Sequence, residues 1–114
     1  MLKIEKTKAD EHITLRLEGE VDASNSVELD LAIQQLMAEN EKKILIEGYS
    51  LEYISSAGLG VFMSYLEDFQ DSGVRFAIFG LNSKVKNVFH ILGLDQLLTI
   101  EDDEQAALKW LYEG

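Results

Sequence analysis

The sequence predicts an α/β fold with a mostly parallel five-stranded mixed sheet, an antiparallel pair at its N-terminal edge and about four helices. Three observations support this prediction. Apolar residues alternate with polar ones at residues 2–4 and 13–17, as in half-exposed strands. Residues 42–49 contain the apolar run Ile44, Leu45 and Ile46, and residues 74–79 contain a second such run; both are typical of strands buried on both faces. Amphipathic stretches separate these runs, as strand–helix–strand units require.

The first amphipathic stretch predicts a helix over residues 24–40. We expect Asp22 or Ser24 to cap it, because short polar side chains accept hydrogen bonds from the free N–H groups of a first turn. Two sets of apolar residues recur at helical spacing in this stretch: Val27 with Leu31, and Leu29 with Ile33, Leu36 and Met37.

Three further elements complete the chain. Residues 59–69 have a single apolar helical face. Asn82 or Ser83 is expected to begin another helix, and Gly93 to end it in a left-handed conformation.

A short strand at residues 97–100 and a terminal helix from residue 102 onward follow. The acids at the start of this last helix suit the positive end of its dipole.

The composition favours one soluble domain spanning residues 1–114. The 114 residues are 46% hydrophobic, which is enough for one core, and the chain has no cysteine for a disulfide or a thiolate metal site. Charged residues are interleaved from the start, so we expect no signal peptide or membrane insertion and a cytoplasmic location. The net charge of -11 disfavours nucleic acids and anionic lipids as direct partners and favours a protein with a basic face.

The most informative segment is Tyr53-Ile54-Ser55-Ser56-Ala57-Gly58-Leu59-Gly60, where a buried strand gives way to a helix. Ser55 or Ser56 could cap the helix, and Gly58 could let the backbone pass close to a neighbour. The same turn could instead expose the serines to a partner, because α/β proteins bind ligands at the carboxyl ends of parallel strands. The residues alone leave both interpretations open.

Catalytic and cofactor chemistry fits this segment poorly. A phosphate-binding loop needs Lys followed by Ser or Thr, which the segment lacks. A nucleophile elbow around Ser56 needs glycine at position 54, which is Ile54, and a nearby base, for which only His12 and His90 are available. The acids at residues 102–104 are better explained as helix capping than as metal ligands. We therefore expect no catalytic residue, cofactor or metal.

The segment resembles the signature of the bacterial STAS-domain anti-sigma factor antagonists, usually Asp-Ser-Ser-Gly-Leu-Gly or Asp-Ser-Thr-Gly-Leu-Gly after a strand ending in a hydrophobic pair. Ser56 falls on the family's phosphorylated serine, Ala57 on its second hydroxyl residue and Ser55 on its usual aspartate. The stretch Leu17-Glu18-Gly19-Glu20-Val21-Asp22 is similar to the family's Gly-x-Leu-Asp turn. The order of predicted elements matches the family along essentially the whole chain.

The resemblance implies a protein that binds an anti-sigma factor, itself a serine kinase of the histidine-kinase-like ATPase type, and so releases a sigma factor. Phosphorylation of Ser56 would end this binding, and a serine phosphatase would restore it. The implied partner-binding residues are Asp22, Ser55, Ser56, Ala57, Gly58 and Leu59.

Two other roles of the same fold remain open from the sequence. One is an accessory subunit of a lipid or anion transport complex, and the other is a STAS partner-switching module that does not act on a sigma factor.

Overall fold

The computed structural model describes residues 1–113, which form a five-stranded sheet in the order β1-β2-β3-β4-β5. β1 pairs with β2 in antiparallel fashion, and every other neighbouring pair is parallel. The predicted mixed sheet with its antiparallel N-terminal pair is therefore confirmed. The strands are β1 (Leu2–Lys8), β2 (Ile13–Val21), β3 (Lys43–Ile54), β4 (Arg75–Phe79) and β5 (Thr99–Glu101).

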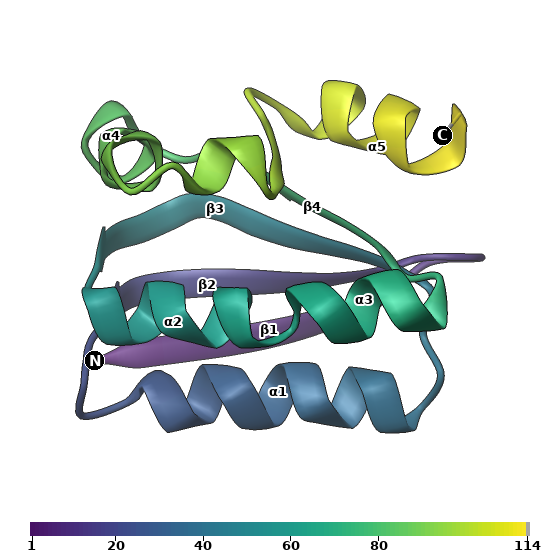
Figure 1. Cartoon of the computed structure of the whole chain (residues 1–114), viewed down its shortest axis with the longest axis horizontal. Helices are drawn as coiled ribbons and strands as arrows, with labels where there is room; N and C mark the ends of the chain where they lie inside the picture. Colours follow the sequence, from purple (N-terminus) through teal and green to yellow (C-terminus); the bar gives the residue numbers. More distant parts are fainter. Residues whose placement is uncertain (114) are drawn as a thin grey trace.

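The helices correspond to the four predicted ones, with the second divided into two. They are α1 (Ser26–Ala38), α2 (Ser56–Ser64), α3 (Leu66–Ser72), α4 (Ser83–Ile91) and α5 (Glu104–Glu113), with a 3₁₀ turn, η1 (Leu94–Gln96), before β5. Figure 1 shows α1 and the α2–α3 pair running side by side, with α5 apart from them.

The sheet has a buried core on each face. Ile44 and Ile46 of β3 belong to the large core shared with α1, α2, α3 and α4. Leu45, which points the opposite way, packs with Ala107 and Leu111 of α5. Right-handed crossovers between successive parallel strands explain why α1 to α4 share one face. The prediction that β3 is buried on both faces is confirmed.

β3 is longer than the predicted 42–49 strand and continues to Ile54. Its pairing with β2 changes register, so that Gly48 and Tyr49 both lie opposite Leu17. This arrangement is a β-bulge, in which one strand carries an extra residue. Beyond the bulge, Leu51 and Ile54 return to the core, which carries the strand to the predicted functional turn.

Several predicted helix boundaries are shifted. The helix expected at 59–69 begins three residues earlier and is interrupted at Tyr65, where α2 ends and α3 begins. The strand expected at 97–100 is β5, which begins two residues later. The two residues between η1 and β5 do not pair with β4.

The two ends of α4 agree with the sequence. Asn82 caps its first turn by accepting a hydrogen bond from Val85 N (2.8 Å), and Gly93 follows it in the left-handed region (φ 73°).

Candidate partner-binding site at the β3–α2 turn

Ser55 is the residue that joins β3 to α2. Its side chain accepts a hydrogen bond from Gly58 N (3.4 Å), so it is the N-cap of α2. Its backbone N–H donates to Val21 O (2.9 Å), and its carbonyl accepts from Leu59 N (3.0 Å). The hydroxyl of Ser55 is thus engaged in capping α2, while its backbone N–H holds the turn against β2.

Ser56 has a different environment from its neighbour. It is the first residue of α2 and is exposed to solvent. Its hydroxyl has no hydrogen-bond partner among residues 1–113. Because the fold does not use this hydroxyl, it is available to another molecule.

Gly58 and Leu59 support the turn from inside. A Cβ at Gly58 would lie 2.7 Å from Ile54 Cγ1 and 2.7 Å from Val21 Cγ1, so only glycine lets the first turn of α2 pack against these strand ends. Leu59 is 1% exposed and belongs to the core. Both residues are buried in this structure and position Ser55 and Ser56, and the contact of Gly58 and Leu59 with a partner stays a prediction.

Asp22 lies beside this turn, because Val21 is paired with Ile54 at the ends of two neighbouring parallel strands. Its carboxylate accepts hydrogen bonds from the hydroxyl (2.5 Å) and backbone N–H (2.9 Å) of Ser24. The hydrogen bond from the Ser24 hydroxyl is the main reason why the pKa of Asp22 is lowered below its ordinary value. Asp22 therefore places a negative charge next to Ser55 at neutral pH.

The prediction that Asp22 or Ser24 caps α1 is wrong, because neither side chain bonds to the first turn of the helix. Asn25 occupies the N-cap position without a side-chain bond to the helix. Its side chain instead accepts from Asp22 N (2.9 Å) and donates to Glu20 O (3.0 Å).

Asn25 is 7% exposed, and it is the buried polar residue that fixes the β2–α1 loop beside Ser55. The role of Asn25 was not predicted from the sequence, although several short polar residues follow β2.

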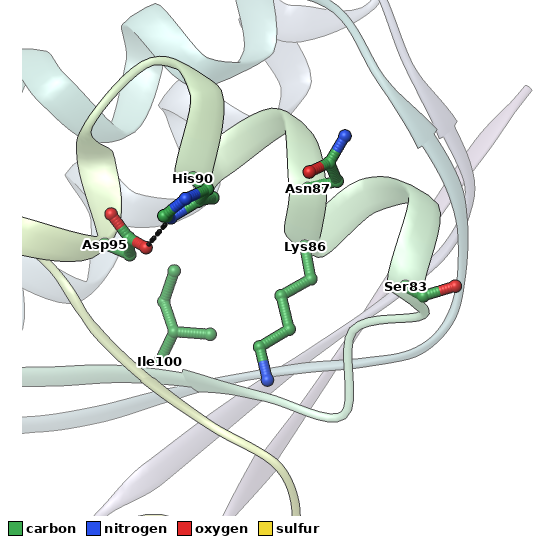
Figure 2. A pocket seen from close by; sticks show the side chains of 6 residues that line it. All are labelled: Ser83, Lys86, Asn87, His90, Asp95 and Ile100. Atoms are coloured by element: carbon green, nitrogen blue, oxygen red, sulfur yellow. Dashed lines mark hydrogen bonds and ion pairs between the residues drawn. The ribbon is translucent and has the colours of Figure 1, made fainter.

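A separate pocket of about 390 Å³ lies between α4, η1 and β5, and it contains none of the predicted site residues. Figure 2 shows His90 turned toward Asp95, with a hydrogen bond of 2.7 Å, and Lys86 extending beside Ile100. Lys86 also pairs with Asp102 (2.7 Å), which lowers the pKa of that carboxyl below its ordinary value.

The two histidines both have partners away from the serine turn. His90 is bonded to Asp95, and His12 Nδ1 is 2.5 Å from the hydroxyl of Tyr112. Neither imidazole is hydrogen-bonded to Ser55 or Ser56, so the turn has no Ser–His pair.

Within residues 1–113, no three His, Asp or Glu side chains gather in a way that could hold a metal ion. The described helices include none with the length and apolar character needed to cross a membrane.

The sequence matches the model of a known domain family. The model of the STAS domain matches residues 3–107, and the chain belongs to the STAS domain family.

Its relatives are anti-sigma factor antagonists. The chain is 25% identical over 101 residues to an anti-sigma-B factor antagonist of Staphylococcus aureus, an alignment covering 89% of this chain and 94% of that protein. An anti-sigma factor antagonist from Mycobacterium paratuberculosis superposes with a TM-score of 0.88 at 19% identity, covering 97% of this chain and 94% of that one.

SpoIIAA of Bacillus, in its phosphorylated form, superposes with a TM-score of 0.70 at 18% identity, covering 96% of this chain and 98% of that one. These structural likenesses establish the fold.

Proposed function

We propose that this protein is an anti-sigma factor antagonist that binds an anti-sigma factor through the turn carrying Ser56 and thereby frees a sigma factor. The anti-sigma factor is a serine kinase of the histidine-kinase-like ATPase type. It phosphorylates Ser56 and so ends the binding, and a serine phosphatase reverses the modification. In this role the protein acts in the bacterial cytoplasm and is the substrate of the chemistry rather than a catalyst.

The observation that carries the proposal is the contrast between two adjacent serines. Ser55 uses its hydroxyl to cap α2, whereas Ser56 is exposed with a free hydroxyl. A kinase active site can reach only a hydroxyl that projects from the surface. The names of the relatives, and the phosphorylated form of SpoIIAA among them, support the same role.

The fold is expected to accept a phosphate on Ser56. The first residue of α2 lies at the positive end of the helix dipole, where an anion is favourable. A phosphoserine carries a charge of roughly -1.5 to -2, so its main effect is on whatever contacts the turn. Asp22 adds a second negative charge beside it, and the β2–α1 loop and α2 themselves supply no Lys, Arg or His. The N-terminal ammonium, which pairs with Glu20 (3.8 Å), is a positive charge that acts on Asp22.

The proposed contact residues are Asp22, Ser55, Ser56 and Ala57, which lie at or next to the turn. A kinase that binds these residues must bring the terminal phosphate of its own nucleotide close to the Ser56 hydroxyl. Once Ser56 carries a phosphate, that group meets the nucleotide phosphates at close range, and like charges weaken the complex.

The direct test is phosphorylation by the histidine-kinase-like anti-sigma factor encoded in the same genome, with ATP and magnesium. We expect one phosphate on Ser56 by intact-mass and fragment spectra. Ser56→Ala should abolish the modification, while Ser55→Ala, the matched control, should retain it because Ser55 serves the fold. Phosphate found only on Ser55, or none on the wild-type protein, contradicts the proposal.

A second test separates the effect of a negative charge at residue 56 on binding from an effect on the fold. Ser56→Asp is expected to lower the affinity for the kinase at least tenfold, with an unchanged circular dichroism spectrum, because the exposed position tolerates a carboxylate at the helix start. Ser56→Asn, which has the same shape without the charge, should bind more tightly than Ser56→Asp. Equal affinities for the two variants would exclude the charge mechanism.

A further inference from the structure

β1 is an edge strand with one open side. It has seven residues and, within residues 1–113, it pairs only with β2. β5, at the other edge of the sheet, has three residues. Figure 1 shows β1 lying next to β2 at the border of the sheet. A long edge strand is a template for pairing with another chain, because its outer N–H and C=O groups are free to bond.

The open side of β1 presents the backbone of its even-numbered residues. Glu20 N donates to Met1 O (3.1 Å) at one end of the antiparallel ladder. Ala9 N donates to His12 O (2.9 Å) at the other end. Hydrogen-bonded pairs alternate along such a ladder, so the odd-numbered residues of β1 bond to β2. The even-numbered residues turn their N–H and C=O groups outward: Leu2, Ile4, Lys6 and Lys8.

The face of β1 toward α1 is apolar near its centre. Ile4 lines a groove of about 360 Å³ between β1, β2 and α1. Leu15, Leu31 and Ala32 continue the apolar lining, and Leu31 is 56% exposed. The polar residues of the groove are Lys6, Glu28 and Gln35. A strand added beside β1 would cover apolar surface that the isolated chain leaves in water.

The other face of β1 carries an exposed ion pair. Lys3 Nζ lies 3.9 Å from Glu5 Oε1, and both side chains are exposed. Glu5 also accepts a hydrogen bond from Arg16 (3.1 Å). β1 therefore carries charges of both signs in a fixed order. Two further lysines of β1 are paired with acids that follow α1: Lys6 with Glu39 (3.7 Å) and Lys8 with Glu41 (2.6 Å).

These charges select one register for the pairing of β1 with β1 of a second copy. Two identical antiparallel strands are related by a two-fold axis. An axis at residue 3, 5 or 6 sets Lys3, Glu5 or Lys6 opposite the same residue of the second copy, and an axis at residue 7 sets Lys6 opposite Lys8. Like charges directly opposite each other are destabilising. An axis at Ile4 instead sets Lys3 opposite Glu5 of the second copy, and it does so twice.

The same register satisfies the backbone. With the axis at Ile4, even-numbered residues lie opposite even-numbered residues, so Ile4 bonds to Ile4 and Leu2 bonds to Lys6 of the second copy. Lys3 and Glu5 form a non-hydrogen-bonded pair, in which the side chains are closest. An axis between two residues would set the outward N–H groups opposite backbone that is already bonded to β2.

We propose that β1 is a self-association surface: two copies of this chain pair their β1 strands in antiparallel fashion about Ile4 and form one continuous sheet. The groove lined by Ile4 and Leu31 is then covered by the second copy. Because β3 is two strands away from β1, the pairing leaves Ser56 of both copies exposed. The two serine turns lie at opposite ends of the joint sheet, since the paired strands are antiparallel. The inference is independent of the proposed function, because no anti-sigma factor takes part in it.

The first test reverses the charges of the expected ion pair. Lys3→Glu sets a carboxylate opposite Glu5 of the second copy, and Glu5→Lys sets an ammonium group opposite Lys3. Each change should weaken the dimer at least tenfold in sedimentation equilibrium. The double variant Lys3→Glu/Glu5→Lys restores opposite charges and should dimerise within threefold of the wild type. Lys84→Glu, the control, makes the same charge change at an exposed residue of α4 and should stay within twofold.

The measurements are made in about 150 mM sodium chloride, where the Debye length is about 8 Å and the repulsion between two chains of net charge -11 is screened. A wild type that stays monomeric at millimolar concentration overturns the proposal. A dimer that both single reversals leave intact, or that the folded double variant fails to restore, also overturns it. Melting temperatures identify any variant that is not folded.

The second test uses the wild-type protein alone. Amide exchange measured by NMR at low and high protein concentration distinguishes the two sides of β1. We expect the amides of Ile4 and Lys6 to exchange more slowly at high concentration, because they bond to the second copy. The amides of Lys3 and Glu5, which bond to β2, should be protected at both concentrations. A dimer that forms without slower exchange at Ile4 uses a different surface and contradicts the proposal.

Discussion

Gly58 and Gly60 are two residues apart in the same helix, yet they face opposite surroundings. The position of Gly58 is enclosed by Ile54 and Val21, whereas that of Gly60 is open. The spacing of the two glycines in the sequence gives no sign of this difference. It follows from which side of α2 meets the strand ends.

The enclosure of Gly58 gives the first prediction at the residue scale. Gly58→Ala is expected to lower the free energy of unfolding by about 1–3 kcal/mol, because the new methyl group must displace Ile54 or Val21 in a packed core. Urea denaturation measures the change. Gly60→Ala is the control in the same helix, and a Gly58→Ala variant that is as stable as the Gly60→Ala variant would contradict the close packing.

Asn25 gives the second prediction. Asn25→Ala breaks the bonds to Asp22 N and Glu20 O and removes the partner of two part-buried backbone groups. We expect a loss of about 2 kcal/mol in stability and faster amide exchange of Asp22, measured by hydrogen–deuterium exchange. Ser24→Ala, which removes an exposed neighbour, should change the stability much less. Slow exchange at Asp22 in the Asn25→Ala variant would show that another contact holds the loop.

Part of this site could be predicted at the residue scale and part could not. The sequence located the turn, offered the serines as capping candidates and indicated a close approach at Gly58, because small residues directly after a buried strand are typical of a tight strand-to-helix turn. It predicted Asp22 or Ser24 as the cap of α1 and did not identify Asn25, although all three side chains can accept hydrogen bonds near a helix start. The choice depends on the backbone path after β2.

At the scale of elements, the contact between α1 and the α2–α3 break depends on Tyr65. Its hydroxyl donates to the carboxylate (2.6 Å) and backbone carbonyl (3.1 Å) of Asp30. Burial is the main cause that raises the pKa of Tyr65, and the hydrogen bond to Asp30 adds to it. The folded protein therefore holds the phenol proton more tightly than the unfolded chain does.

This pKa shift predicts a loss of stability in alkali. Below pH ~10, the pKa of an unperturbed tyrosine, the full contribution of Tyr65 is present. As the pH rises above that value the unfolded chain releases the proton first, so the contribution is lost progressively. Tyr65→Phe should be about 1 kcal/mol less stable than the wild type at pH 8, and the difference should shrink above pH ~10 in denaturation curves. A constant difference would contradict the hydrogen bond.

The boundaries of elements were predicted less well than their order. The apolar run of β3 stops at Tyr49 in the sequence because a bulge there and the exposed residues Glu52 and Tyr53 interrupt the alternation. The pairing with β2 nevertheless carries the strand to Ile54. The break at Tyr65 leaves no trace in the apolar spacing, because Phe62, Leu66 and Phe69 keep the helical period across it.

At the scale of the whole molecule, the charge is unevenly distributed. The net charge is -11, and the segments 17–41 and 44–74 supply acids without any base. The ten Lys and Arg residues all lie outside these segments, on β1, in the middle of β2, at the start of β3 and from Arg75 onward. The charged side chains of α1, α2 and α3 themselves are therefore all acidic, whereas five other acids of these segments pair with basic groups of β1, β2 or the N-terminus: Glu18, Glu20, Glu39, Glu41 and Glu47.

This asymmetry predicts a salt-dependent stability. Screening of like charges should raise the melting temperature by a few degrees between about 10 mM and about 300 mM sodium chloride, because the Debye length falls from about 30 Å at the lower concentration to below about 10 Å. Sodium sulfate at matched ionic strength controls for specific ion effects. A melting temperature that falls with sodium chloride would mean that the ion pairs, such as that of Lys8 with Glu41 (2.6 Å), outweigh the repulsion.

The arrangement of the sheet was the most predictable feature at this scale. The alternation of apolar and polar residues predicted the two N-terminal strands, and apolar runs predicted β3 and β4. Because the connections between strands are short, few strand orders were possible. The division of the core between two faces was less visible, because the apolar residues of α5 do not reveal which face of the sheet they meet.

The cap formed by Ser55 explains why this position can differ from the family's usual aspartate without harm to the fold. An N-cap needs only a short side chain with an acceptor oxygen, and Ser, Asp and Asn serve almost equally well. Aspartate and serine are therefore interchangeable for the architecture of the turn, and the exchange alters only its charge. Residue 55 is accordingly a place where the electrostatic match to a partner can be retuned while the presentation of Ser56 stays constant.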